Sequence, residues 1–224
     1  MYLYELHCHT KETSKCASSS GKEYIKFFKE QGYSGIFITD HFFNGNTCVD
    51  PLLPWEQRVK EFMKGYEIAK QEGEKQGIDV FFGFEYSYNW CHLLTFGLDE
   101  QWLLSNPDIL SLSPADYLKK VRADGGMVVH AHPFRDGIEL VRLFPDLVDA
   151  VEVYNASQTE KANRRALAYG EMLGLPFVAG SDIHSTAKNT LGAVGFDSKI
   201  TDINDFINKV KAGKANIIKK EICK

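Results

Sequence analysis

All seven histidines of this 224-residue chain lie in short clusters with carboxylates or with one another, mostly just after hydrophobic, strand-like runs. Histidines placed by chance would also fall on helices and surface loops. Imidazole together with carboxylate is the ligand mixture that binds zinc, manganese or iron. The pattern therefore indicates a metalloenzyme. The histidines are His7, His9, His41, His92, His130, His132 and His184.

The spacing inside two clusters suits one shared ion. His7 and His9 are alternate residues of a predicted strand, so both imidazoles point to the same side. Cys8 between them then faces away and is expected to be a small packed thiol. Asp182 and His184 repeat this spacing at another predicted strand end.

Three further clusters supply a carboxylate and more imidazoles. Glu85 follows a strand-like run and offers a carboxylate that can bridge two metal ions, with His92 seven residues later. Pro133 ends the next run and so fixes the direction of His132. His130 is expected to be a supporting or core histidine, with direct ligation as the alternative.

Short runs rich in Val, Ile, Phe and Tyr predict eight strands, separated mostly by helices. Ser20 with Glu23 forms a capping-box pattern, and Ser113 precedes a first-turn proline. The strands are expected at residues 2–7, 35–40, 80–85, 92–97, 127–131, 150–154, 177–180 and 192–196. The helices are expected at residues 20–32, 55 to 73 or 77, 113–125, 157–173 and 202–212.

Alternating strands and helices predict right-handed crossovers and a mostly parallel sheet, closed into a barrel. An open doubly wound sheet is the alternative. In such a barrel the functional groups lie beyond the carboxyl ends of the strands. Every cluster lies at such an end except His92, which starts its run. The barrel would therefore gather the clusters at one rim.

Composition limits the classes of function. With 44% hydrophobic and 25% charged residues, residues 1–224 are expected to form a single globular domain. A net charge of -4 argues against a nucleic-acid partner bound through a basic surface. The start is no signal peptide, and no run approaches the roughly 20 apolar residues of a membrane span, so no membrane is expected. Five cysteines without C-x-x-C spacing predict reduced thiols in a cytoplasmic protein. Oligomeric state cannot be predicted.

The motifs together resemble the polymerase-and-histidinol-phosphatase (PHP) family of metal-dependent phosphoesterases, over nearly the whole chain. They are H-C-H-T, I-T-D-H, G-F-E with a following His, A-H-P-F, V-E-V-Y-N-A and G-S-D-I-H. The resemblance implies a distorted seven-stranded β/α, TIM-like barrel with the metal site at the carboxyl ends of the strands. It also implies two or three zinc, manganese or iron ions and a bridging hydroxide.

Carried over by position, the resemblance implies three ion sites. The first comprises His7, His9, Glu85 and Asp182, the second Glu85, His92 and His132, and the third His41 and His184. The family commonly supplies another His or Asp a few residues after the H-x-H pair, where this chain has Ser14 and Lys15, neither a good ligand. Glu12 or Cys16 is a candidate substitute. The third site is otherwise incomplete, or completed by water and substrate.

The reaction that the resemblance implies is hydrolysis of a small phosphomonoester by the bridging hydroxide. His184 or His41 is the candidate acid for the leaving alkoxide, and Asp40 is expected to orient a neighbouring imidazole. Arg135 is the candidate phosphate contact, with a surface salt bridge as the alternative. Lys15 is either a phosphate contact or a solvated loop lysine.

The substrate could be a sugar phosphate, histidinol phosphate or a nucleotide. Asn155 resembles a family position near the pocket and is expected to support the ligands. Three alternative functions stay open: a nuclease or phosphodiesterase, an amide- or lactone-cleaving amidohydrolase-like barrel, and a metal-stabilised binding domain without turnover.

Overall fold

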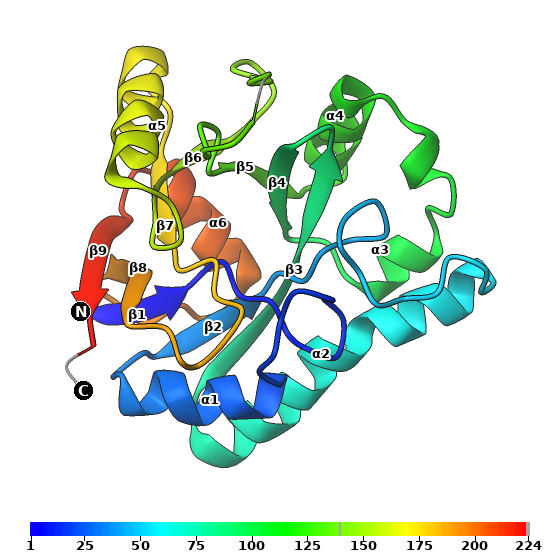
Figure 1. Cartoon of the computed structure of the whole chain (residues 1–224), viewed down its shortest axis with the longest axis horizontal. Helices are drawn as coiled ribbons and strands as arrows, with labels where there is room; N and C mark the ends of the chain where they lie inside the picture. Colours follow the sequence, from blue (N-terminus) through cyan, green and yellow to red (C-terminus); the bar gives the residue numbers. More distant parts are fainter. Residues whose placement is uncertain (139, 223–224) are drawn as a thin grey trace.

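The computed structural model describes residues 1–138 and 140–222 of the chain. Within these residues the chain forms nine strands, six α-helices and one 3₁₀ helix (Figure 1). The strands are β1 (Tyr2–Glu5), β2 (Gly35–Ile38), β3 (Asp79–Tyr88), β4 (Cys91–Phe96), β5 (Met127–Ala131), β6 (Ala150–Asn155), β7 (Phe177–Gly180), β8 (Thr190–Phe196) and β9 (Asn216–Glu221). The helices are α1 (Gly21–Glu30), α2 (Trp55–Gln76), α3 (Glu100–Leu104), α4 (Pro114–Ala123), α5 (Glu160–Leu173) and α6 (Ile203–Lys211), with the 3₁₀ helix at Ile109–Ser111.

One sheet holds the strands in the order β7-β6-β5-β4-β3-β2-β1-β8-β9. The expectation of a mostly parallel sheet is wrong, because four of the eight strand pairs are antiparallel. β4 is reversed because only two residues, Asn89 and Trp90, join it to β3. Both have positive φ, 45° and 68°, as a tight type I′ hairpin turn requires.

Strands β1 to β7 curl into a nearly closed barrel, which confirms the predicted α/β, TIM-like fold class. The chain just beyond β1 meets the chain just beyond β7: the His9 N–H donates to the Ile183 carbonyl, and the Ile183 N–H donates to the His7 carbonyl, both at 3.0 Å. β8 and β9 extend the sheet from β1. The sheet therefore has nine strands, whereas the sequence runs predicted eight and the resemblance implied a seven-stranded barrel. β9 escaped prediction because its sequence, N-I-I-K-K-E, is mostly polar.

The reversal of β4 explains the one histidine that did not lie at a strand end. In an antiparallel strand the first residues lie beside the last residues of its neighbours. His92 accordingly pairs with Ser87 of β3 and with Ala131 of β5. Its position at the start of β4 therefore places it at the same edge of the barrel as the other clusters.

Local signals set the helix ends as predicted. Ser20 and Glu23 form both halves of a capping box on α1, and the Ser113 hydroxyl accepts from the Asp116 N–H at the start of α4. Gly77 ends α2 in the left-handed conformation. α5 begins three residues later than expected, because Thr159 is its cap. None of the helices in the described ranges is long and apolar enough to cross a membrane.

The barrel interior is apolar below the histidines. α6 packs its Phe206 ring against Phe37 and Phe96, with ring centroids 4.4 and 5.4 Å away. All three side chains are fully buried and belong to one cluster with residues of β1, β4, β5 and β8. Because these aromatic side chains fill the interior of the barrel, a polar site would lie at its carboxyl edge.

The contact between β7 and β8 yields a first prediction. A Cβ on Gly192 would lie 2.3 Å from the Gly180 carbonyl oxygen, which is backbone and cannot swing away. We expect Gly192→Ala to destabilise the fold by about 1–3 kcal/mol in urea unfolding, as overpacking does. Gly32→Ala is the comparison: its φ is 77° but its Cβ meets nothing within 4 Å, so it should cost about 1 kcal/mol. Equal losses would show that close packing does not constrain Gly192.

Candidate metal centre

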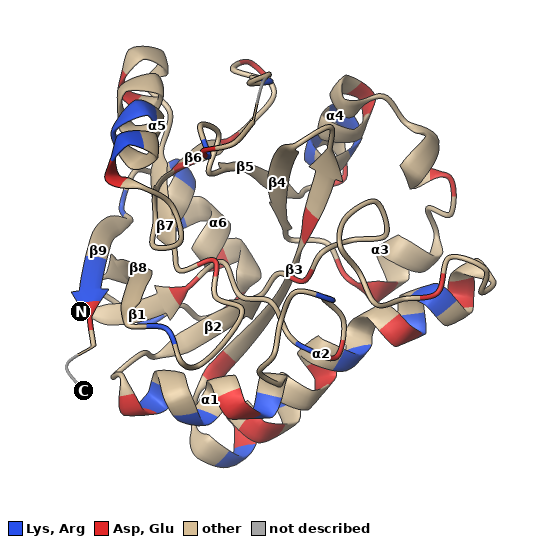
Figure 2. Ribbon diagram, viewed as in Figure 1, with Lys and Arg blue, Asp and Glu red and all other residues tan. Residues whose placement is uncertain are grey.

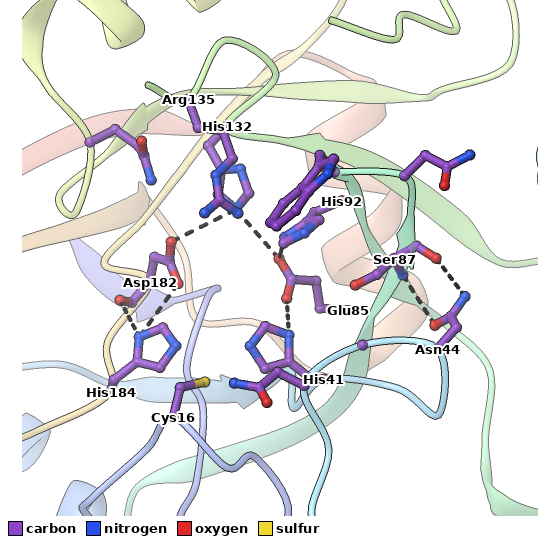
Figure 3. A pocket seen from close by; sticks show the side chains of 15 residues that line it. Cys16, His41, Asn44, Glu85, Ser87, His92, His132, Arg135, Asp182 and His184 are labelled. Carbon is purple, nitrogen blue, oxygen red and sulfur yellow. Dashed lines mark hydrogen bonds and ion pairs between the residues drawn. The ribbon is translucent and has the colours of Figure 1, made fainter. Parts of the chain in front are cut away.

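Eight side chains predicted as metal ligands converge at the carboxyl edge of the barrel, and Figure 3 shows those of them that line the cavity there. They reach it from loops after β1, β2, β5 and β7, from β3 itself and from the start of β4. They surround or underlie a cavity of about 540 Å³. The side chains are His7, His9, His41, Glu85, His92, His132, Asp182 and His184.

Glu85 is the centre of this cluster. Its side chain is 1% exposed, with Oε2 2.5 Å from His41 Nδ1 and Oε1 2.8 Å from His92 Nδ1. Oε1 also lies 3.3 Å from His7 Nε2 and 3.4 Å from His132 Nε2. One carboxylate therefore faces four imidazoles within 3.5 Å.

Asp182 occupies the opposite side of the cluster. Its Oδ1 lies 3.4 Å from His9 Nε2 and 3.6 Å from His7 Nε2, and its Oδ2 lies 3.7 Å from His132 Nε2. The Asp182 backbone carbonyl lies 3.0 Å from His184 Nδ1, so Nε2 is the nitrogen of that ring that stays available to a ligand. His7, His9 and His132 thus lie between the two carboxylates.

The donor atoms form three overlapping groups that fit divalent ions. Within each group the atoms lie within 4.8 Å of one another, the separation expected of ligands about 2 Å from a shared ion. Two of the imidazole nitrogens, His7 Nε2 and His9 Nε2, are buried without a hydrogen-bond partner in the described structure. Burying unpaired polar atoms is costly, so the arrangement is suited to cations. The groups are His7, Glu85 and His132; His7, His9 and Asp182; and His9, His41 and His184.

Mutual charges keep both carboxylates ionised. Burial raises the pKa of Glu85, but His92 and His41 outweigh it and hold that pKa well below its usual range. Asp182 behaves alike: burial raises its pKa, but His7 and His9 outweigh this effect and hold that pKa well below its usual range. Burial, with His41 nearby, holds the pKa of His9 well below its usual value, so this imidazole is neutral as a metal ligand must be.

Two of the clustered residues have unusual backbone conformations. His132 has a φ of 25° and Asp182 a φ of 49°, in the left-handed region that most residues avoid. Such conformations persist only where the surroundings hold them, and they gather at functional sites. Both residues contribute side chains to the cluster, so their backbone conformations agree with a preorganised binding site.

Glu152, which the sequence analysis did not single out, holds two of these histidines. It is buried, its Oε1 lies 3.0 Å from His7 Nδ1, and its Oε2 accepts the His132 N–H at 2.8 Å. Asn155 donates to Glu152 at 2.9 Å and to Asp182 at 3.3 Å, the supporting place expected of it. The available signal was an acid inside the apolar strand V-E-V-Y.

A second buried acid was also missed. Glu5 on β1 accepts the His7 N–H at 2.8 Å, the Ser181 N–H at 2.7 Å and the Ser181 hydroxyl. It thereby ties the end of β1 to the end of β7. Burial raises its pKa to about 7, although the hydrogen bonds from Ser181 and His7 oppose the rise.

Asp40, expected to orient an imidazole, does so only indirectly. It accepts from the Thr10 N–H, the Thr10 hydroxyl and the Ser14 hydroxyl at 2.6–2.7 Å. Among the described residues none of its hydrogen bonds reaches a histidine; the Ser14 hydroxyl lies 3.4 Å from His9 Nδ1. Because Asp40 does not line the cavity, its place is that of a positioning residue and not of one that touches substrate.

The two candidate phosphate contacts lie in different places. Arg135 lines the cavity beside His132 and forms no ion pair with any residue that the structure describes. Lys15 is exposed and does not line the cavity, which favours the solvated-lysine alternative. His130, favoured as a core histidine, is buried with Nε2 3.4 Å from the Cys91 sulfur, and burial lowers its pKa to about 3.

The cavity is also lined by Cys16, one of the two candidate substitutes for the missing ligand, and by several residues that were not predicted. Cys16 lies beside His184 and His41 (Figure 3). Burial raises the pKa of its thiol, but hydrogen bonds with these two imidazoles lower it to about 6. The rim is otherwise polar and aromatic, and nothing in the local sequence signals it. It comprises Asn44, Asn46, Ser87, Asn89, Trp90 and Gln158.

Replacing Glu152 tests its positioning role. We expect Glu152→Gln to lower metal affinity about 10- to 100-fold, because it loses the charge beside His7 Nδ1 and an acceptor for the His132 N–H. Titration of metal-free protein measures this. Glu171→Gln, on the exposed face of α5, should bind metal as the wild type does. Unchanged affinity in the Glu152 variant would contradict the role.

Replacing Glu5 tests the consequence of its raised pKa. The carboxyl keeps its proton in the folded protein between its ordinary pKa of 4.5 and about 7, whereas the unfolded chain releases it. This stabilisation is complete below pH 4.5 and is lost as the pH rises to 7. In metal-free protein, the wild type should therefore lose about 1 kcal/mol per pH unit across this window relative to Glu5→Gln. Urea unfolding at a series of pH values measures the difference, and a constant difference would contradict the assignment.

Comparison with known proteins agrees with the geometry. The sequence profile of the PHP domain matches residues 5–174, and that of the PHP-associated region matches residues 160–215. No curated protein matches the chain.

Solved structures share the fold at low sequence identity. A two-domain protein from Bacteroides vulgatus, containing a predicted PHP-like metal-dependent phosphoesterase, has a TM-score of 0.70 at 14% identity; the match covers 97% of this chain and 64% of that one. A Bifidobacterium adolescentis protein proposed to be a metal-dependent phosphoesterase has a TM-score of 0.58 at 16% identity, covering 95% and 96%. An amidohydrolase from Chromobacterium violaceum, solved with sulfate and no metal, has a TM-score of 0.56 at 16% identity, covering 81% and 87%. Since the matched profile spans most of its length and includes six of the eight clustered ligands, the chain belongs to the PHP domain family.

Proposed function

We propose that this protein is a metal-dependent phosphoesterase that hydrolyses a small phosphomonoester. The observation that carries the proposal is the set of three overlapping donor groups, in which His7 Nε2 and His9 Nε2 are buried and unpartnered. Membership of the PHP family supports metal-dependent hydrolysis. β8 pairs with β1 and β9 pairs with β8, which supports treating residues 1–224 as one PHP-type domain.

When bound, two or three zinc, manganese or iron ions would supply a hydroxide at neutral pH and a positive charge for the reacting phosphate. His7, His9, Glu85, His92, His132 and Asp182 would hold the first two, and His41 and His184 would contribute to the third. Two divalent ions carry four positive charges and the two carboxylates return two negative ones, so the loaded site would favour an anion.

Two further groups fit the reaction. Arg135, free of ion pairs in the described structure, would bind phosphate oxygens with its planar guanidinium. With two ions bound and the third site empty, His184 would be the better placed of the two candidate acids to give a proton to the leaving alkoxide, because its side chain is 32% exposed at the rim. His41, at 10%, is more enclosed.

The shape and charge of the protein support a small substrate. The cavity of about 540 Å³ is the size of a small-molecule pocket, and amide side chains at its rim could bind hydroxyl groups. Figure 2 shows Lys and Arg mixed with Asp and Glu along α2. A nucleic-acid substrate would favour a basic track.

Two alternatives have their own support. Likeness to the Chromobacterium violaceum amidohydrolase favours amide or lactone cleavage as a second candidate function. The absence of a carboxylate from the third donor group keeps open a metal-stabilised binding domain without turnover. A nuclease or phosphodiesterase remains the alternative within phosphoester chemistry.

Hydrolysis of an aryl phosphate tests the proposal. Metal-loaded wild type should release the phenol, and His7→Ala and Asp182→Ala should each lower the rate at least about 100-fold because they remove ligands. Circular dichroism checks that both variants fold, and Lys15→Ala should keep the rate.

The outcomes separate the alternatives. Activity that persists in both ligand variants would refute the site. Faster cleavage of the matching aryl diester would favour the phosphodiesterase, and activity only on amides or lactones would favour the amidohydrolase. Bound metal without turnover on any of these would favour the binding domain.

A further inference from the structure

The third donor group differs from the other two in its chemistry. His9, His41 and His184 bring three neutral imidazoles and no carboxylate, whereas Glu85 or Asp182 belongs to each of the other groups. An ion held here would lack an anionic ligand of its own. His9 Nε2 lies 3.4 Å from Asp182 Oδ1 and 3.8 Å from Glu85 Oε2, so this nitrogen faces the carboxylate-containing groups, and His41 and His184 are left for the third ion.

The two nearest polar residues on the adjoining loop are already engaged or directed away. The Ser14 hydroxyl donates to Asp40 at 2.7 Å and accepts the His41 N–H at 3.1 Å. Lys15 is exposed and outside the cavity. Neither is therefore available as a ligand to an ion held by His41 and His184.

Cys16 is the next residue of the same loop, and its side chain lies between His184 and His41 (Figure 3). Backbone hydrogen bonds fix the loop on both sides of it. The Lys15 N–H donates to the Asn46 carbonyl at 2.9 Å, and the Ser18 N–H donates to the His184 carbonyl at 2.8 Å. The backbone of Cys16 is therefore fixed beside His41 and His184 before any ion binds, although its sulfur is not part of the three groups of donor atoms that lie within 4.8 Å of one another.

We propose that the Cys16 thiolate completes a third cation site with His41 and His184. This inference rests on the metal centre of the proposed function and specifies the chemistry of one part of it. A bound divalent ion displaces the thiol proton to solvent, so the site gains the single negative charge that its imidazoles lack. One thiolate and two imidazoles, with water in the fourth position, are a donor set that suits zinc.

The sulfur ligand gives this site a metal preference of its own. Thiolate favours softer ions such as Zn²⁺ and Co²⁺ over Mn²⁺, whereas imidazole with carboxylate accepts all of them. Manganese should then fill the two carboxylate-containing groups and leave the third for zinc. Imidazole ligands without the thiolate would not give this preference for zinc over manganese.

Cobalt substitution tests the proposal without reference to activity. Metal-free protein is titrated with Co²⁺ under reducing conditions, and absorption and bound cobalt are measured. Wild type and Cys48→Ser, which removes an exposed cysteine outside the cavity, should show the near-ultraviolet thiolate-to-cobalt charge-transfer band. Cys16→Ser should lose the band and bind one cobalt ion fewer. Cys16→Asp should regain the ion without the band.

The outcomes distinguish this inference from the function it rests on. Visible cobalt bands without the near-ultraviolet band in wild type would overturn the role of Cys16 and leave the metal centre intact. A near-ultraviolet band that survives in Cys16→Ser would overturn it equally. If no variant binds cobalt or zinc at all, the metal centre fails and the inference fails with it.

Discussion

Two ionised carboxylates buried among six imidazoles are the constraint on which this structure depends. Glu85 and Asp182 are 1% and 10% exposed in their side chains, and water can solvate neither well. Buried charge is tolerated only where opposite charge or hydrogen bonds compensate it. The imidazoles provide part of that compensation, yet several of their nitrogens find no hydrogen-bond partner in the described structure. Divalent cations would satisfy both sets of atoms at once.

A second layer of buried acids holds this cluster in place. Glu5 accepts the His7 N–H, Asp40 accepts the Thr10 N–H and Glu152 accepts the His132 N–H. Each bond fixes the backbone at a strand end from which a donor side chain projects. Because the loops are fixed by groups that do not face the cavity, the donor atoms can stay close together without an ion between them. Such outer partners commonly govern how well a metal site works.

The barrel assigns different tasks to its two ends. The aromatic cluster around Phe206 fills the interior and stabilises the fold. The opposite edge carries the strained His132 and Asp182 and the loop with Cys16. Separation of this kind lets loops at the site vary in sequence without disturbing the core, which is how a serine-lysine-cysteine segment can replace the family's usual ligand.

The sequence alone determined the kinds of side chain in the site and the class of fold. Strand runs, helix caps such as Ser20 with Glu23, and the same-side spacing of His7 and His9 depend on residues a few positions apart, so they are readable locally. The reversed direction of β4, which brings His92 to the edge, depends on pairing with β5. The contacts of Glu5 with Ser181 and of Glu152 with His7 join residues far apart in the chain. Only the tertiary structure places Cys16, and not Lys15, beside His184, because the loop's direction is set by hydrogen bonds to distant backbone groups.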